Sequence, residues 1–195
     1  MVGFIAVTAP AFGDVCDTTA GNIVLNCGFE ANSTVPPTDW TFTPAPSGSD
    51  FYIGPPAFSG VNAANFGAYG AFDDTISQTL PTAAGGIYDL QFYLQHESTN
   101  AQNDFSASFG GVPVFSLVDA PAFPYELINV PGLAATGPTT LSFSGLEVDA
   151  YYDLDSVSVT QTGSLATPEP SSVLLLMTCL AGLTGIPRLR RAFGR

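Results

Sequence analysis

The chain has 195 residues, with 17 Asp or Glu and only four Lys or Arg, and its formal net charge is −13. All four basic residues are arginines at or after position 188, so the body of the chain has no basic side chain to neutralise phosphate. This excludes nucleic acid as a partner, and also an anionic membrane surface or a phosphate-bearing substrate for the body. The 20 Gly, 16 Pro and 15 Phe residues favour a turn-rich β domain.

The first segment, residues 1–13, has some features of a signal peptide. Its start is apolar, and Ala9-Pro10-Ala11 fits a small-x-small cleavage pattern. A basic n-region is missing and the apolar run is short. Either the true start of translation lies upstream, or this segment is not a signal peptide. We expect the first, with a mature chain that begins near Phe12 or Asp14, because the C-terminal tail described below requires export.

Two cysteines follow. Cys16 and Cys27 flank the strand-like run Asn22–Asn26. In an exported protein such a pair predicts one disulfide that fastens the N-terminal segment. A zinc site would need more Cys or His ligands nearby, and the sequence has none there. A pair of free, buried cysteines stays open as the alternative.

Residues 14–161 read as short alternating runs separated by Gly, Pro, Asn and Asp. In the clearest run, Tyr88–Leu94, every second residue is apolar, and Gly110-Gly111 between two further runs predicts a hairpin turn. About eight to eleven such strands and no helical period before Ser171 predict an all-β, two-sheet antiparallel β-sandwich of the jelly-roll type. The expected strands are Ile23–Leu25, Trp40–Thr43, Asp50–Ile53, Ala63–Phe66, Thr75–Leu80, Tyr88–Leu94, Asp104–Phe109, Val112–Leu117, Tyr125–Val130, Thr139–Ser144 and Tyr152–Thr160.

Several local strings occur in a characteristic order. Asn26-Cys-Gly-Phe-Glu30 precedes Trp40, then come Ile76–Leu80 with Tyr88–Phe92, and finally Leu154–Val159. Together they resemble the galactose-binding-like jelly roll found in many carbohydrate-binding modules. In that family the opening usually reads Asn-Gly-Gly-Phe-Glu and the last strand carries Asp-Asp-Val. Here Cys27 stands for the first Gly and Ser156 for the second Asp. The resemblance covers roughly residues 22–160.

The resemblance implies a structural Ca²⁺ ion between the opening-strand Glu and an Asp of the last strand. The matching positions are Glu30 and Asp155. Oxygen ligands without competing Lys or Arg suit a hard cation. The alternative is that both residues are solvated or hydrogen-bonded turn residues. No other cofactor is expected.

A glycan site would need exposed aromatic faces beside planar polar groups. The alternative is that the aromatic residues fill the core, where they contribute most. The rims of such a site would come from the loops between Pro55 and Gly70 and from Ala120–Tyr125. The aromatic candidates are Trp40, Tyr52, Tyr69, Tyr93, Tyr125, Tyr151 and Tyr152.

Hydrolysis would need two carboxylates at a defined separation. Acidic loops explain the available carboxylates equally well. A Ser-His-Asp arrangement would depend on His96, the only histidine, which we expect to be a solvated loop residue. We therefore expect no catalytic residues. The carboxylates considered are Asp73, Asp74, Asp149, Asp153 and Asp155.

The C-terminal tail follows a linker at residues 162–167 and carries all the positive charge. It begins with Pro168-Glu169-Pro170, continues with an uncharged apolar run to Ile186, and ends in a basic stop of Arg188, Arg190 and Arg191 with Arg195 last. A helix of this run would span roughly 24 Å, against about 30 Å of hydrocarbon. An expected transmembrane helix over residues 171–187 would keep the arginines cytoplasmic. An ordinary membrane anchor or a buried core helix would show a similar apolar run, whereas a GPI-type tail would lack the arginines.

The order of these three parts resembles the PEP-CTERM sorting signal of Gram-negative bacteria, over residues 168–195. This resemblance implies that an exosortase, a membrane-embedded transpeptidase, recognises Pro168, Glu169 and Pro170 and removes the tail. It implies an inner-membrane precursor and a product at the cell surface or in the extracellular matrix. We therefore expect an exported structural or glycan-binding protein, non-catalytic and associated with exopolysaccharide. The alternatives are a secreted carbohydrate-active hydrolase and a plain tail-anchored surface protein.

Overall fold

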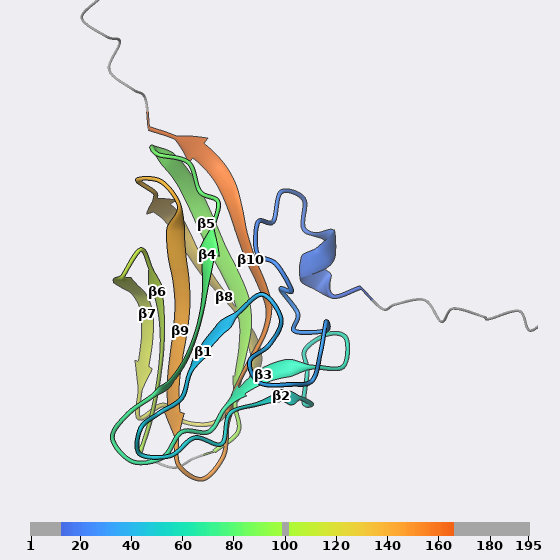
Figure 1. The fold of residues 1–195 in the computed structure, drawn as a ribbon, viewed down its shortest axis with the longest axis vertical. Helices are drawn as coiled ribbons and strands as arrows, with labels where there is room; N and C mark the ends of the chain where they lie inside the picture. Colours follow the sequence, from blue (N-terminus) through green and yellow to red (C-terminus); the bar gives the residue numbers. More distant parts are fainter. Residues whose placement is uncertain (1–12, 99–101, 166–195) are drawn as a thin grey trace, which may run out of the picture. The chain divides into compact units, whose positions relative to one another are not determined.

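The computed structural model describes residues 13–98 and 102–165. In this part of the chain it contains a short 3-10 helix, η1 (Val15–Thr18), and ten strands in two five-stranded antiparallel sheets. The sheets face each other as a sandwich (Figure 1). The all-β, two-sheet prediction is confirmed.

The two sheets draw their strands from the whole length of the body. Sheet 1 has the order β1 (Thr41–Thr43), β4 (Asp74–Leu80), β9 (Thr139–Glu147), β6 (Asn103–Phe109) and β7 (Val112–Val118). Sheet 2 has the order β2 (Tyr52–Gly54), β3 (Ala63–Phe66), β10 (Tyr152–Ser164), β5 (Gly86–His96) and β8 (Phe123–Ala134). Along the chain β8, β9 and β10 alternate between the sheets, so each crossover runs around an end of the sandwich (Figure 1).

The core lies between the sheets and is rich in aromatic rings. Every second residue of β5 is buried, because side chains alternate across a strand. Phe92 of sheet 2 meets Phe143 of sheet 1 edge to face with a ring-centroid distance of 5.2 Å, and it also contacts Phe105. Burial of each such ring contributes about 2–3 kcal/mol. The alternation that predicted the strands is therefore the pattern that fills the core.

Ile23–Leu25, expected as a strand, is not one. Asn22 forms only an isolated bridge with Thr160 of β10. The amide of Val24 donates to the Asn22 side chain, and the amide of Leu25 donates to Gln78 Oε1. The amides of Val24 and Leu25 therefore donate to side chains and not to a neighbouring strand. At the other end, β10 continues to Ser164 and includes the first three residues of the expected linker.

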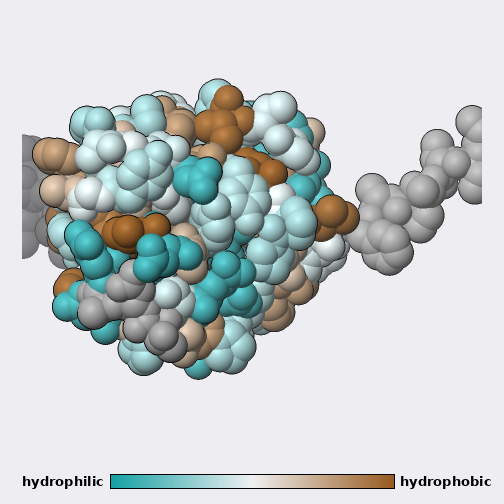
Figure 2. Space-filling model, turned by 90° about the horizontal axis from the view of Figure 1, so that it is seen from below, coloured by the Kyte–Doolittle hydropathy of each residue, from teal (hydrophilic) through white to brown (hydrophobic). Residues whose placement is uncertain are grey.

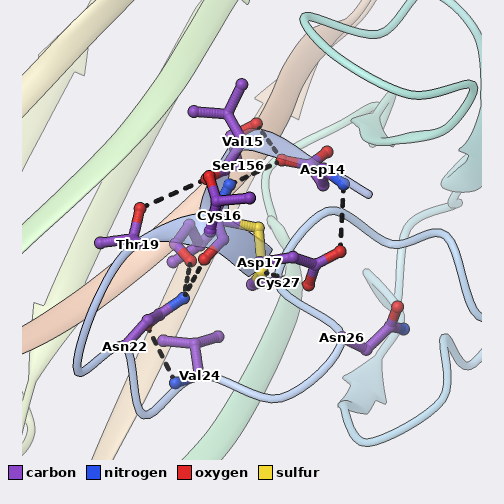
Figure 3. Close-up of a disulfide and its surroundings, with 12 residues drawn as sticks. Asp14, Val15, Cys16, Asp17, Thr19, Asn22, Val24, Asn26, Cys27 and Ser156 are labelled. Carbon is purple, nitrogen blue, oxygen red and sulfur yellow. Dashed lines mark hydrogen bonds between the residues drawn. A yellow bond between two sulfur atoms is a disulfide. The ribbon is translucent and has the colours of Figure 1, made fainter. Parts of the chain in front are cut away.

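The predicted disulfide between Cys16 and Cys27 is present, with a Cα–Cα distance of 6.0 Å. It fastens η1 to the segment before β1 (Figure 3). Asp14 caps η1 by accepting from the Cys16 amide, and it also accepts from the Ser156 hydroxyl of β10. Asn22 adds two bonds to the backbone of Val157 and Val159. The N-terminal segment is therefore attached to the last strand by side-chain hydrogen bonds.

The chain divides into a unit ending at Leu165 and a second unit, Ala166–Arg195. The expected sorting motif, the transmembrane helix over 171–187 and the basic stop fall in the second unit, which lies outside the described residues, as does most of segment 1–13. Among the residues that are described, no helix has the length and apolar character needed to cross a membrane.

Candidate functional site

A pocket of about 340 Å³ opens at the end of the sandwich where the chain passes from β9 to β10. Three loops meet there: the loop before β2, the loop after β3 and the loop at 148–151. Figure 2 shows this end, which is the lower one in Figure 1, as a mainly polar surface with separate apolar spots. The lining residues are Asp50, Gly67, Tyr69, Val148, Asp149, Ala150 and Tyr151.

Tyr151 is the best-anchored aromatic side chain of the pocket. Its hydroxyl donates to Asp50 Oδ2 at 2.6 Å, and its ring packs edge to face on Tyr52 with a centroid distance of 5.0 Å. The hydrogen bond to Asp50 raises the pKa of the phenol above its ordinary value, with burial as a second cause. Tyr151 is therefore a fixed, neutral aromatic wall beside a carboxylate.

Two glycines allow the tyrosine rings to lie directly on the backbone. A Cβ at Gly67 would come within 2.5 Å of the Tyr151 ring. A Cβ at Gly48, whose φ is +138°, would come within 2.1 Å of the Tyr69 ring. Tyr69 is 45% exposed. The pocket thus combines two placed aromatic rings with two carboxylates, Asp50 and Asp149.

The structure divides the seven aromatic candidates. Trp40 and Tyr152 are buried in the core, so they cannot stack on a ligand. Tyr93 stacks on Phe58 on the outer face of sheet 2, and the Tyr125 hydroxyl donates to the Pro56 carbonyl. These contacts fix the loop that follows β2. Tyr69 and Tyr151 line the pocket, and Tyr52 supports it.

The outer face of sheet 1 offers hydroxyl groups rather than rings. Across the described strands β4, β9 and β6 its outward positions carry only Ser, Thr, Asp104 and Leu146, and neighbouring hydroxyls such as those of Thr75 and Ser144 bond to each other at 2.8 Å. A sugar ring would find no aromatic platform on these strands. The pocket is therefore the better candidate for a ligand site.

Glu30 and Asp155, the expected calcium ligands, both bind the loop between β2 and β3. Glu30 Oε1 accepts from the amides of Val61 and Asn62 at 2.6 and 2.7 Å. Asp155 is fully buried, and it accepts from the amides of Phe58, Ser59 and Ser156. N–H donors thus occupy the oxygens that a cation would need. The arrangement does not fit a calcium ion shared by these two residues.

His96 is not a solvated loop residue, contrary to the expectation. It ends β5 and is 1% exposed, with Nε2 2.6 Å from Glu147 Oε2 and Nδ1 3.1 Å from the Pro121 carbonyl. Both ring nitrogens are engaged, so this histidine is not available to activate a serine. The pair could not be predicted from local sequence patterns, because its members lie 51 residues apart.

The five carboxylates considered for hydrolysis lie in different surroundings. Asp73 bonds to the Asp104 side chain, and Asp74 accepts from the Ala45 amide. Asp153 and Asp155 are buried in β10, while Asp149 lines the pocket. Asp50, which sequence reasoning missed, is the second pocket carboxylate, and only its place before a short strand distinguished it.

No family model matches the sequence, and no curated protein matches it. Solved structures do resemble the fold. The carbohydrate-binding module TmCBM61, solved in complex with β-1,4-galactotriose, has a TM-score of 0.53 at 18% identity and aligns over 72% of this chain and 98% of its own. The family 22 carbohydrate-binding module of Clostridium thermocellum Xyn10B has a TM-score of 0.51 at 11% identity, over 76% of this chain and 98% of its own.

A third similar structure is the K3 cleaved adhesin domain of Lys-gingipain from Porphyromonas gingivalis, with a TM-score of 0.51 at 16% identity, over 70% of this chain and 96% of its own. The chain shares the jelly-roll fold of carbohydrate-binding modules. At these identities the likeness establishes the fold alone. It confirms the fold implied by the sequence motifs, and the function has to be argued from the site.

Proposed function

We propose that the protein is an exported, non-catalytic glycan-binding protein, and that the pocket lined by Tyr69 and Tyr151 is its ligand site. The observation that carries the proposal is the placement of these two rings beside Asp50 and Asp149 in one pocket. Its volume of about 340 Å³ lies at the lower end of the range for small-ligand sites, about 300–1,000 Å³. A pocket of this size at a sandwich end suits the terminus or a short segment of a polysaccharide.

The chemistry of the pocket matches a sugar. The C–H face of a pyranose ring packs on an aromatic face, and the ring hydroxyls donate to carboxylates and phenols. Tyr69 is partly exposed, and it lines the pocket together with the carboxylates of Asp50 and Asp149. The Tyr151–Asp50 bond holds the pocket in place before a ligand arrives, which lowers the entropy cost of binding.

Sorting to the cell surface or exopolysaccharide matrix completes the proposal. It is supported by the sequence order of Pro168-Glu169-Pro170, apolar run and arginine cluster. An exosortase would be the processing partner, and the inner membrane the site of the precursor. Replacing Glu169 by Gln in the native host should leave unprocessed, membrane-retained protein. Normal processing of that variant would favour a plain tail-anchored protein.

A glycan array with the full chain in mild detergent tests the binding function. The expected result is a set of polysaccharide hits that weaken at least tenfold in Tyr69→Ala and are unchanged in Leu127→Ala, a side chain of similar exposure on β8. Equal binding by the two variants, or no hits at all, would count against the pocket.

The rival function, a carbohydrate-active hydrolase, rests on the presence of Asp50 and Asp149 in the same pocket. A hydrolysis screen on the array hits decides between the two. Release of reducing sugar that disappears in Asp149→Asn, while binding persists, would establish the hydrolase and end the non-catalytic proposal.

A further inference from the structure

A row of polar side chains crosses the outer face of sheet 2. Register places Tyr52 of β2 beside Asn65 of β3, and Asn65 beside Asp153 of β10. Gln95 of β5 lies on the other side of Asp153. Residues paired in this way share one face of the sheet, with Cβ atoms about 4.5–5.5 Å apart. Asn65 and Asp153 are 0% exposed, although they point away from the core between the sheets.

The loop between β2 and β3 is fastened to this face. The Tyr52 hydroxyl donates to the Pro55 carbonyl, and the Tyr125 hydroxyl donates to the Pro56 carbonyl at 2.9 Å. The amides of Phe58 and Ser59 then donate to Asp155 Oδ2. The loop thus covers a row of polar side chains that would otherwise be exposed to solvent on the outer face of sheet 2.

Three buried oxygens of this row accept no hydrogen bond from the described part of the chain. They are both carboxylate oxygens of Asp153 and the amide oxygen of Asn65. The orientation of Asn65 is fixed, because its Nδ2 donates to the carbonyls of Ala63 and Gly54 at 2.9 and 3.0 Å. Its Oδ1 can therefore only accept a hydrogen bond or bind a cation. Buried acceptors without a donor are costly and rare in folded proteins.

The surroundings supply no positive charge from the described residues. Before Arg188 the sequence contains no Lys or Arg, and His96 is engaged by Glu147. Other acids add to the negative field: Asp155 lies two residues along β10, and Glu97 follows β5. Burial, and after it the charge of Glu97, raises the pKa of Asp153 from 3.8 to about 8. The carboxylate lacks a cationic partner.

We propose that Asp153 and Asn65 bind a calcium ion, with Gln95, which is paired with Asp153 across the strands, as a further oxygen ligand. Calcium is held by carboxylate and amide oxygens, and those are the atoms left without partners here. This position differs from the Glu30 and Asp155 pair, whose oxygens accept backbone N–H bonds. The ion would connect β3 and β10 beneath the loop and so stabilise the fold.

The test uses the full chain, purified in mild detergent and dialysed against calcium-free buffer. Bound calcium is counted by elemental analysis, and thermal melts are recorded in EDTA and in millimolar CaCl₂. The expected result for the native chain is one tightly held calcium ion and a melting temperature at least about 5 °C higher in calcium. Asp153→Asn should lose both, while Asp119→Asn, an exposed control, should behave as the native chain. No calcium in the native chain, or full retention of calcium in Asp153→Asn, would overturn the proposal.

Asn65→Asp keeps the test decisive if Asp153→Asn fails to fold. A second carboxylate should bind calcium more tightly, so the difference between melts in calcium and in EDTA should widen. If Asn65→Asp instead loses the same stability in both buffers, the oxygens do not face a cation. Asp153 would then be protonated and no cation would be bound there, so the proposal would be wrong.

Discussion

His96 and Glu147 form a buried pair that joins the two sheets, because His96 ends β5 of sheet 2 and Glu147 ends β9 of sheet 1. The Pro121 carbonyl can only accept, so Nδ1 carries a hydrogen, and a further proton lies between Nε2 and the carboxylate. Tyr152 stacks on the imidazole with a centroid distance of 4.2 Å. The pair therefore acts as a polar cross-link at the end of the sandwich that holds the pocket.

Breaking this pair should be more harmful than removing it. His96→Ala or Glu147→Ala leaves one buried polar partner unsatisfied, and each should lower the free energy of unfolding by about 3–5 kcal/mol. The double variant His96→Phe/Glu147→Leu fills the space with apolar atoms and should be more stable than either single variant. Urea unfolding measures all three. If the free energies of unfolding of the single variants lay within 1 kcal/mol of the native value, the pair would not contribute to stability.

Gly67→Ala should damage the pocket without unfolding the domain. The added methyl group would come within 2.5 Å of the Tyr151 ring, so the ring has to move away from Asp50. Glycan affinity should fall at least tenfold, with a change in melting temperature of about 3 °C or less. Gly163→Ala, whose nearest neighbour atom lies 3.9 Å from the new Cβ, is the matched control. Unaltered affinity in Gly67→Ala would exclude Tyr151 from the site.

Asp104 should make stability fall with rising pH. Burial and the neighbouring Asp73 raise its pKa from 3.8 to about 6. The folded state therefore binds this proton more tightly than the unfolded state, and the associated stability is present below about pH 4 and is lost as the pH approaches 6. In Asp104→Asn this loss should be absent, so the melting temperatures of the two proteins should diverge between pH 4 and 6. A constant difference over that range would contradict the pKa shift.

The Cys16–Cys27 disulfide should stabilise the attachment of the N-terminal segment. It closes a short loop, so its removal in Cys16→Ala/Cys27→Ala should cost about 2–3 kcal/mol. Dithiothreitol should lower the melting temperature of the native chain and leave that of the double variant unchanged. The same response of both proteins to the reductant would mean that the bridge is not formed in solution.

The strands could be predicted because alternation is a local property: Tyr88, Leu90 and Phe92 each show which face is buried. The Ile23–Leu25 prediction was wrong because Asn22 and the distant Gln78 satisfy its amides. Side-chain hydrogen bonds of this kind do not change the alternation of apolar residues along the sequence.

The site was less accessible to sequence reasoning. Asp50, Gly67 and Tyr151 come from three loops that meet only in the fold, so no spacing connects them. The burial of Asp153 likewise depends on a loop that Tyr125 holds from another strand. Sequence motifs predicted the kind of fold and the aromatic candidates, but not which tyrosines stay open.

Calorimetric titration of the best array glycan into the native chain, Tyr69→Ala and Leu127→Ala tests the central claim most directly. The account predicts saturable binding by the native chain and by Leu127→Ala, and at least a tenfold loss of affinity in Tyr69→Ala with an unchanged melting temperature. Native affinity in Tyr69→Ala would contradict it, because the exposed aromatic side chain of the pocket would then have no part in binding.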